Sequence, residues 1–467
     1  MYVADLLDRT SNGTRVELYG WVKSRRRHNH VVFLDVCDST GTVQSVVDET
    51  NKELLKLAKR ISQETAVKVV GILTETGRPN PPKEIHVQEI KIVGVSTINV
   101  SPYPRSDIDI LDPKLQEQLL DKRHFYLRNE KIAAILKFRH VLTWAVHQWF
   151  HKNGFIEIHA PVLTPTPLYD DRTAMALKVH GQDVFLTQCV GFYLEQAVHA
   201  FEKIYNIGPS FRAEESRSKR HLMEYWHIKA ELAFVDFEDM VATVEQFIRD
   251  VSEQCVHEGS GLARTIGTEM CGDGLKIPFP RIDYYEAVEW LKTQGSDMEF
   301  GKSLGSNEES LLSSRFGNIP FWVVGIPRSI EPFPYVIDSA DPRRTKTADL
   351  IASRGFGELL GIAEKIHTLP MLDERLAEKG KAGDARYEWL RELRQYGCVP
   401  HGGFGMGLER FIRWLLQIPH VRDTIPFHRA FGRKINPGRH KRENKNIQVR
   451  PSETKGEGNS PLCPFIF

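Results

Sequence analysis

The sequence has little of what a secreted or membrane protein needs. Its six cysteines are scattered over 467 residues and none forms a C-x-x-C pair, so neither a zinc site nor a redox motif of that spacing is predicted. Such scatter fits reduced cytoplasmic thiols better than a disulfide framework. The opening residues are charged where a secretory signal needs an apolar core, and no apolar run approaches the length of a membrane span. We therefore expect a cytoplasmic protein without a membrane segment.

The chain also lacks an excess of charge of either sign. Its 62 basic and 61 acidic residues give a formal net charge of +1. A protein that binds polyanions often carries more positive charge, although local basic patches remain compatible with a total near zero. A length of 467 residues predicts two or more domains.

The composition changes along the chain. Residues 1–100 contain strand-like runs such as "TRVELYGWVKSRRR" and "AVKVVGILTE" between turn residues, which predict a small β-barrel or sandwich. Residues 101–122 are rich in Pro, Ser and Asp and indicate a linker. Residues 123–432 mix helical and strand periodicities and predict an α+β domain. The polar, basic residues 433–467 indicate a disordered tail, more typical of a solvated segment than of a nucleic-acid contact.

A charged block at 211–226, "FRAEESRSKRHLMEYW", carries residues suited to phosphate chemistry. Arg212 could hold a carboxylate or phosphate in bidentate fashion. Arg217 and His221 could contact a polyphosphate, and Tyr225 could stack on a purine. The alternative is a charged loop between two strands.

Two further blocks add candidates. In "PHGGFGMGLERFIRWLL" at 400–416, glycines in a tight turn are expected to lead into an amphipathic helix that carries Arg410. In "ADLIASRGFGELLG" at 348–361, Asp349 and Glu358 are candidate Mg²⁺ ligands, because Mg²⁺ favours carboxylates together with phosphate oxygens. Taken alone, the two acids are better explained as surface residues.

Taken together, the blocks resemble a known family. "FRAEE" with "RHLMEYW", and "GGFGMGLER", resemble motifs 2 and 3 of class II aminoacyl-tRNA synthetases, and "HAPVLT" with Pro161 resembles motif 1 and its dimer-interface proline. "VPHGGFGMGLER" and "VRDTIPFHR" look most like the asparaginyl enzymes, with the aspartyl enzymes next. The resemblance runs from about residue 14 to about 430. It implies an OB-fold β-barrel, then an α+β catalytic domain with an antiparallel sheet flanked by helices, and a homodimer.

The resemblance implies that ATP, with Mg²⁺, activates a carboxylic or amino acid as an acyl-adenylate and releases pyrophosphate. By the same resemblance, tRNA is a candidate acceptor of the acyl group. The implied contacts are Arg212 to the α-phosphate and the substrate carboxylate, Glu214 and Tyr225 to adenine, Arg217 and His221 to pyrophosphate, Arg410 to the γ-phosphate, and Asp349 and Glu358 to Mg²⁺. Such catalysis is mostly positioning and charge stabilisation.

The N-terminal segment "GWVKSRRRHNHVVFLDVCDSTGTVQSVV" is similar to the anticodon-binding OB-fold of these enzymes. The resemblance implies that Phe33 stacks on a central anticodon base, that Gln44 hydrogen-bonds to that base and that Arg26 helps to hold the loop. Stacking on an aromatic side chain contributes about 1–3 kcal/mol per base.

The part of the site that should bind the acid departs from the family. In "HIKAELAF" at 227–234, polar and apolar residues alternate, and Lys229 stands where the asparaginyl enzymes have a Glu that reads the amide. Lys365 stands where their Arg reads the side-chain oxygen. Cys189 and Gly191 replace a Ser and a Gln that hold the α-amino group. We also place Gly403 of motif 3 in this pocket.

Three functions fit these features. The first is an asparagine–tRNA ligase with an unusual pocket. The second is a paralogue that activates another acid and forms an amide with a small amine, without tRNA. The third is an inactive RNA-binding or regulatory protein, against which the retained Arg212, Glu214, His221, Glu358 and Arg410 argue. The pocket residues disfavour the asparagine amide, since a site built for one hydrogen-bonding group can reject analogues by about 10⁴-fold.

Overall fold

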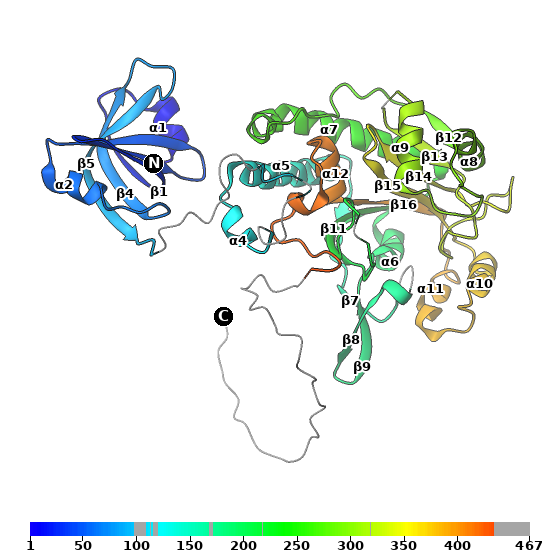
Figure 1. Cartoon of the computed structure of the whole chain (residues 1–467). Coiled ribbons are helices and arrows are strands. Elements are labelled where there is room, and N and C mark those ends of the chain that lie inside the picture. Colours follow the sequence, from blue (N-terminus) through cyan, green and yellow to red (C-terminus); the bar gives the residue numbers. More distant parts are fainter. Residues whose placement is uncertain are drawn as a thin grey trace, which may run out of the picture. The chain divides into compact units, whose positions relative to one another are not determined.

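A computed structural model describes residues 1–97, 109–112, 114, 120–167, 171–216, 218–317 and 319–433 (Figure 1). Most of the expected linker at 101–122 and nearly all of the expected tail at 433–467 lie outside these residues. The chain divides into two compact units. The first comprises Met1–Leu115, His124–Lys137 and Gly261–Thr268, and the second comprises Gln116–Arg123, Phe138–Ser260 and Glu269–Phe467.

The first unit contains a closed five-stranded barrel, drawn in blue in Figure 1. Its strand order is β1-β2-β3-β5-β4, and the pairing of β1 with β4 closes it. Alternate residues of the strands point inward, and Leu18, Val32, Leu34 and Val69 are fully buried in its core. The elements are α1 Val3–Arg9, β1 Arg15–Arg27, β2 Val31–Cys37, β3 Thr42–Asp48, α2 Lys52–Ala58, β4 Ala66–Glu75 and β5 Lys83–Gly94.

The second unit is built on an eight-stranded sheet in the order β12-β13-β14-β15-β16-β11-β10-β6. Neighbouring strands are antiparallel except at the two edges, where β12 pairs with β13 and β6 with β10 in parallel. The strands are β6 Ile156–Glu157, β10 Lys203–Phe211, β11 Glu224–Ala233, β12 Arg281–Asp283, β13 Phe321–Val324, β14 Thr347–Ala352, β15 Gly357–Lys365 and β16 His401–Gly407. A small sheet has the order β7-β9-β8, with β7 Leu163–Thr164, β8 Met175–Val179 and β9 Gln182–Leu186.

Helices flank the large sheet. On one face, Phe150 of α5 stacks on Tyr205 of β10 with ring centroids 4.2 Å apart, and Phe247 of α7 packs 5.5 Å from Phe404 of β16. The neighbours of Phe404 on β16 therefore point to the opposite face. The helices are α4 Arg123–Tyr126, α5 Glu130–Lys152, α6 Gly191–Phe201, α7 Phe237–Ile266, α8 Tyr284–Thr293, α9 Ser306–Arg315, α10 Leu369–Glu378, α11 Glu388–Leu393 and α12 Leu408–Leu415, with 3₁₀ turns at Asp171–Thr173, Ala385–Tyr387 and Val421–Thr424. A barrel followed by an antiparallel sheet with flanking helices confirms the predicted fold class.

Two local expectations were wrong. Residues 401–407, expected as a tight turn, form the extended strand β16. Its glycines allow close approach rather than turning: a Cβ at Gly403 would lie 2.5 Å from Glu231 Oε2, and one at Gly405 would lie 2.7 Å from His227 Nε2. From the sequence "FIEIHAPVLT" we expect one strand over 155–164, but these residues instead form two two-residue strands, β6 and β7, in different sheets.

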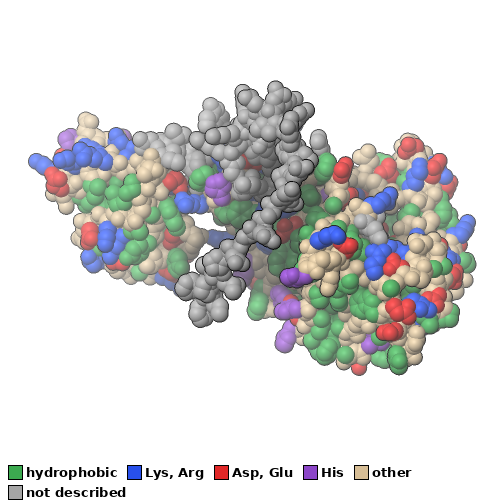
Figure 2. Space-filling view, turned by 90° about the horizontal axis from the view of Figure 1, so that it is seen from below, with side chains coloured by type: hydrophobic (Ala, Val, Ile, Leu, Met, Phe, Trp, Pro, Cys, Tyr) green, Lys and Arg blue, Asp and Glu red, His purple; other side chains and the backbone are tan. Residues whose placement is uncertain are grey.

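No helix among the described residues is long and apolar enough to cross a membrane. Figure 2 shows one face of the molecule, on which basic and acidic side chains are interspersed over the larger unit.

Candidate active site

A cavity of about 860 Å³ lies over the face of the large sheet opposite α5 and α7. That volume falls in the range of about 300–1,000 Å³ typical of small-molecule sites. Its walls come from β11, β14, β15 and β16 and from the segment between β10 and β11. The sequence-predicted residues that line it are Arg212, Glu214, His221, Tyr225, Lys229, Asp349, Glu358, Lys365, Gly403 and Arg410.

Three predicted residues are not placed in this wall. Arg217 lies outside the described residues. Cys189 and Gly191, at the start of α6, are buried but are not among the described residues that line the cavity. Cys189 nevertheless interacts with the side chain of Lys229, a residue of the cavity wall, and raises its pKa.

One row of residues across four strands forms part of the cavity floor. Asp349 of β14 is opposite Gly361 of β15, which is opposite Gly405 of β16, which is opposite Lys229 of β11. Strands spaced by about 4.8 Å put the Cα atoms of Asp349 and Lys229 roughly 14 Å apart. The two glycines leave the floor open between them, and a Cβ at Gly405 would lie 3.3 Å from Lys229 Cδ. The cavity thus has an acidic end at β14 and a basic end at β11.

Carboxylates gather at the acidic end. Asp349 and Glu358 share it with Glu309 of α9 and Glu331, and all four line the cavity. Burial, then the charges of Glu358, Glu331 and Glu309, raise the pKa of Asp349 well above its usual value. Burial raises the pKa values of Glu309 and Glu331 to about 7. Closely grouped carboxylates that repel one another in this way are suited to bind a hard cation with oxygen ligands.

Two arginines reach into the same region. Arg410 of α12 pairs with Glu358 at 3.1 Å, and Arg220 pairs with Glu309. Burial alone would raise the pKa of Glu358, but Arg410 and Arg220 lower it below the usual value. Glu358 is therefore an anion in the neutral range, and both guanidinium groups stand at the cavity wall beside it.

The segment between β10 and β11 supplies the mouth of the cavity. Arg212 follows the end of β10, and its side chain is 36% exposed and 4.0 Å from Glu214. The Nδ1 atom of His221 is 2.8 Å from the hydroxyls of both Ser216 and Ser218. Burial, then Arg410, lower the pKa of His221 to about 4. His221 is thus neutral near pH 7 and can offer an N–H rather than a positive charge.

Lys229 lies at the basic end of the cavity and is only 5% exposed. Burial alone would lower its pKa, but Cys189, Tyr335 and Glu231 raise the pKa above the usual lysine value. The alternation of "HIKAELAF" therefore does not separate a solvent-exposed face of the strand from a buried one, since Glu231 is also buried. Phe234, the last apolar residue of this alternating stretch, is 67% exposed rather than buried. It follows the end of β11 and has a φ of +58°.

Lys365 belongs to a buried ionic network. Its ammonium is 2.7 Å from Glu195 Oε1 and 3.5 Å from Glu231 Oε2, and Arg394 reaches Glu195 Oε2 at 2.8 Å. Burial alone would raise the pKa of Glu195, but Lys365 and Arg394 lower it to about 2. Burial and the neighbouring carboxylate of Glu195 bring the pKa of Glu231 to about 7, against the opposing charge of Lys365.

In the barrel, the three residues predicted to contact a nucleic acid lie together. Arg26 of β1 is opposite Phe33 of β2, and its guanidinium carbon is 5.7 Å from the Phe33 ring centroid. The same guanidinium donates to Gln44 Oε1 at 2.7 Å and pairs with Asp35 at 3.2 Å. Phe33 is half-buried and Arg26 is exposed, so one barrel face offers an aromatic ring and a cation to solvent, whereas the Gln44 amide is buried and hydrogen-bonded to Arg26 and Glu84.

Several residues of the cavity were missed from the sequence. Arg220 stood in the quoted basic run but was given no role. Glu309 and Glu331 lie outside the motifs in sequence and join the cavity wall only through packing, and Glu195 and Arg394 belong to the buried ionic network of Lys365. No local pattern distinguishes them from surface charges.

Comparisons with known proteins agree with this architecture. Residues 115–430 match the family model described as tRNA synthetases class II (D, K and N), and residues 16–93 match the OB-fold nucleic acid binding domain. The asparagine–tRNA ligase of Pyrococcus abyssi is 34% identical over 427 residues, which cover 90% of this chain and 95% of the relative. That of Desulforamulus reducens is 35% identical over 421 residues, covering 90% of this chain and 96% of the relative.

Solved structures are similar over nearly the whole chain. The asparaginyl-tRNA synthetase of Pyrococcus horikoshii complexed with asparaginyl-adenylate superimposes with a TM-score of 0.86 at 33% identity, covering 93% of this chain and 99% of that one. The Entamoeba histolytica asparaginyl-tRNA synthetase in complex with asparaginyl-adenylate gives a TM-score of 0.81 at 26% identity, covering 91% and 97%.

Proposed function

Because the chain belongs to the class II aminoacyl-tRNA synthetase family, as an asparaginyl-tRNA-synthetase-like, adenylate-forming ligase, we propose that its cavity activates a carboxylic acid with ATP and that tRNA accepts the acyl group. The observation that carries this proposal is the meeting of Arg212, Tyr225, Glu358 and Arg410 in one cavity. These residues are separated by up to 198 positions in sequence, and each has the chemistry expected for one part of ATP and the acid.

The acid and ATP would react between the two ends of the cavity. The guanidinium of Arg212 would hold the α-phosphate and the acid's carboxylate together, so that a carboxylate oxygen attacks phosphorus in line and pyrophosphate leaves. Tyr225 and Glu214 would hold the adenine. Arg410, Arg220 and the N–H of His221 would contact the departing pyrophosphate, where negative charge gathers.

We assign Mg²⁺ to Asp349 and Glu358, with Glu309 and Glu331 close by. The mutual repulsion that raises the pKa of Asp349 is relieved when a divalent cation replaces the protons. When bound there, Mg²⁺ would neutralise phosphate charge. The residues present fit the ion, because all four offer carboxylate oxygens at the cavity wall.

The basic end supports an acid whose side group is anionic or rich in acceptors. An ammonium group only donates hydrogen bonds, so the amide NH₂ of asparagine would face donors at Lys229 and Lys365. The carboxylate of Glu231, which lies 3.5 Å from Lys365 and could accept, is fully buried beneath Gly403, and Glu231 is not among the described residues that line the cavity. Asparagine is the competing candidate, because the curated relatives at 34–35% identity are asparagine–tRNA ligases.

The barrel supports tRNA as acceptor. The neighbouring residues Arg26 and Phe33 combine an exposed guanidinium with a half-buried ring that could stack on an unstacked base. An amide-forming paralogue that uses a small amine would have no use for this face.

A homodimer is the proposed assembly. Pro161 is exposed, and apolar side chains at Trp144, Ile156, Leu163 and Phe201 are each at least 47% exposed. Leu163 lies in the segment that resembles motif 1, and exposed apolar side chains of this kind are typical of an interface with another chain. Sedimentation equilibrium that gives a mass near 53.5 kDa at micromolar concentration would contradict the dimer.

The test of adenylation is ATP–pyrophosphate exchange with a panel of acids, in the wild type and in Arg212→Ala. We expect exchange with at least one acid and a loss of about 10²–10³-fold in the variant, the typical cost of removing one group that stabilises developing charge. Arg9→Ala, at a side chain 82% exposed in α1, is the matched control and should exchange normally. Exchange by Arg212→Ala within twofold of wild type would contradict the assignment.

A further inference from the structure

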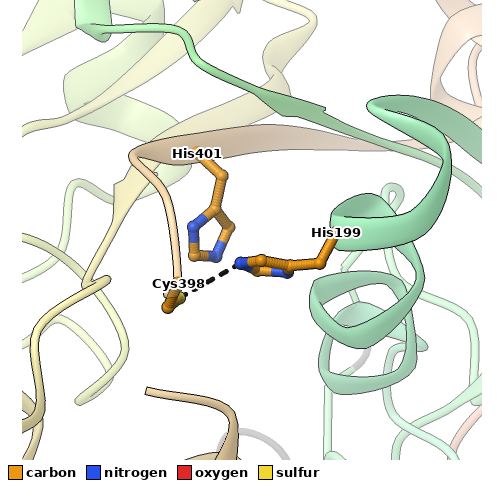
Figure 3. Close-up of side chains that lie close together, drawn as sticks. All are labelled: His199, Cys398 and His401. Carbon is orange, nitrogen blue, oxygen red and sulfur yellow. Dashed lines mark hydrogen bonds between the residues drawn. The ribbon is translucent and has the colours of Figure 1, made fainter. Parts of the chain in front are cut away.

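Three possible metal ligands meet behind the acid pocket, where the proposed reaction has no use for them. His199 comes from α6, and Cys398 and His401 come from the segment that enters β16 (Figure 3). Their ligand atoms all lie within 4.8 Å of one another. His199 Nε2 is 3.2 Å from Cys398 Sγ, and the two imidazole ring centroids are 5.4 Å apart.

Backbone carbonyls fix both imidazoles in the same tautomer. His199 Nδ1 is 2.8 Å from the carbonyl oxygen of Glu195, and His401 Nδ1 is 2.8 Å from that of Val399. A carbonyl can only accept, so each Nδ1 carries the proton and each Nε2 presents a lone pair toward Cys398. Metal-binding histidines are commonly held this way, with the second ring nitrogen donating to a carbonyl or carboxylate.

One of these lone pairs has no use in the protein itself. His401 is fully buried, and its Nε2 has no hydrogen-bond partner among the described residues. Leaving a buried acceptor unpaired is unfavourable, and a bound cation would use this lone pair.

We propose that His199, Cys398 and His401 bind one transition-metal ion of the zinc type. Two imidazole nitrogens and one thiolate are the donor set that Zn²⁺ prefers over hard cations such as Mg²⁺. Bond lengths of about 2.0–2.1 Å to nitrogen and 2.3 Å to sulfur at a tetrahedral angle put ligand atoms about 3.3–3.6 Å apart. The observed spread of 3.2 to at most 4.8 Å needs only small side-chain shifts to reach that arrangement.

Binding exchanges a proton for the metal. The Cys398 thiol loses its proton to solvent as the S–metal bond forms, so uptake is favoured as pH rises. His199 Nε2 also gives up the weak hydrogen bond that it accepts from the Val399 N–H at 3.3 Å. Cys398 is half-buried, which leaves solvent a route to the site and to the fourth coordination position.

The site would tie α6 to β16 beside the acid pocket. Glu195, which pairs with Lys365, precedes His199 by one helical turn, and His401 is directly opposite Lys365 across β15 and β16. The sequence offered a sign of this site in the C-x-x-H spacing of "CVPH", whereas His199 lies 199 residues away from Cys398.

The test is a Co²⁺ titration of the full-length protein after removal of metals with a chelator. We expect one equivalent per chain, a thiolate-to-cobalt charge-transfer band and the intense d–d absorption of tetrahedral Co²⁺, all abolished by added Zn²⁺. Cys398→Ser should lose the charge-transfer band, and His401→Gln should weaken binding by more than about tenfold. Cys37→Ser, at a half-buried thiol in the barrel, is the matched control and should titrate like wild type.

Wild-type protein that takes up no stoichiometric Co²⁺ overturns the proposal without reference to any variant. A charge-transfer band that survives in Cys398→Ser overturns the assignment of the thiolate. Co²⁺ held only at the carboxylate end of the cavity would lack the thiolate band, so it also counts against the proposal. A rise in Tm on adding Zn²⁺, seen in wild type and absent in Cys398→Ser, is the expected second readout.

Discussion

The ammonium of Lys365 and the carboxylate of Glu195 form an ion pair of 2.7 Å in which neither side chain is more than 3% exposed. Arg394 shares Glu195, and Glu231 lies 3.5 Å from Lys365. The charge of Lys365 is therefore largely compensated inside the protein, whereas Lys229 lines the cavity without a carboxylate ion pair among the described residues. Lys229 is accordingly the residue we expect to determine which acid binds.

Replacing Glu195 should be strongly destabilising. Glu195→Gln leaves Lys365 and Arg394 buried beside a neutral amide, and breaking a buried pair in this way typically costs about 3–5 kcal/mol. Urea unfolding at pH 7 measures the change. Combining Glu195→Gln with Lys365→Met should restore part of the stability, because the uncompensated cation is removed as well. A double variant less stable than Glu195→Gln would contradict this reading.

The same pair gives a pH dependence with a definite sign. Folding lowers the pKa of Glu195 from 4.5 to about 2, so its contribution to stability is present above pH 4.5 and is lost as pH falls toward 2. The difference in unfolding free energy between wild type and Glu195→Gln should therefore be largest above about pH 5 and shrink in more acidic buffer. A difference that grows on acidification would refute the pairing.

Lys229→Glu should alter the choice of acid more than the use of ATP. The change reverses a charge at the basic end of the cavity, where the Cα atom of Lys229 lies roughly 14 Å from that of Asp349 on β14. We expect the KM for the preferred acid to rise by at least about tenfold while the KM for ATP stays within about twofold. Lys178→Glu, at a side chain 77% exposed on β8, is the control. Loss of ATP binding in Lys229→Glu would mean that the acid pocket is misplaced.

Asp349→Asn and Glu358→Gln should each increase the Mg²⁺ concentration needed for half-maximal pyrophosphate exchange. Removing one carboxylate ligand is expected to raise it by roughly tenfold, equivalent to about 1.4 kcal/mol. Glu289→Gln, at a side chain 71% exposed on α8, serves as the control. An unchanged Mg²⁺ dependence in both variants would remove these residues from the metal site.

Phe33→Ala should weaken tRNA binding and leave adenylation intact. Losing one stacked base costs about 1–3 kcal/mol, or roughly 5- to 150-fold in Kd. Tyr19→Ala replaces another aromatic residue of the same barrel that is 55% exposed, and it should bind tRNA like wild type. Filter binding measures the affinity, and equal binding by both variants would contradict the role of Phe33.

The fold and most of the cavity residues could be predicted from the sequence, because motifs 2 and 3 supply the adjacent strands β11 and β16. Lys229 and Gly405 are far apart in the chain yet directly paired on β11 and β16. Sequence periodicity predicted the wrong local structure or burial where tertiary packing, rather than the local pattern, determines them. The glycines of β16 were expected to turn, but they serve close approach in a strand, and β11 alternates in polarity while both of its faces are buried.

The charged network and the carboxylate cluster were harder to foresee. Glu195, Lys365 and Arg394 come from α6, β15 and the end of α11, and only folding brings their charges together. A half-buried carboxylate such as Glu331 looks like any surface acid in sequence, because its environment, rather than its neighbours in the chain, raises its pKa to about 7.

The most direct test of the central claim is wild-type ATP–pyrophosphate exchange with asparagine, aspartate and acids with or without an α-amino group, followed by charging of tRNA. The basic end of the cavity predicts that an acid with an anionic or acceptor-rich side group gives a kcat/KM at least about tenfold above that of asparagine, and that the acyl group then reaches tRNA. Robust exchange with asparagine in preference to every other acid would contradict the role assigned to Lys229.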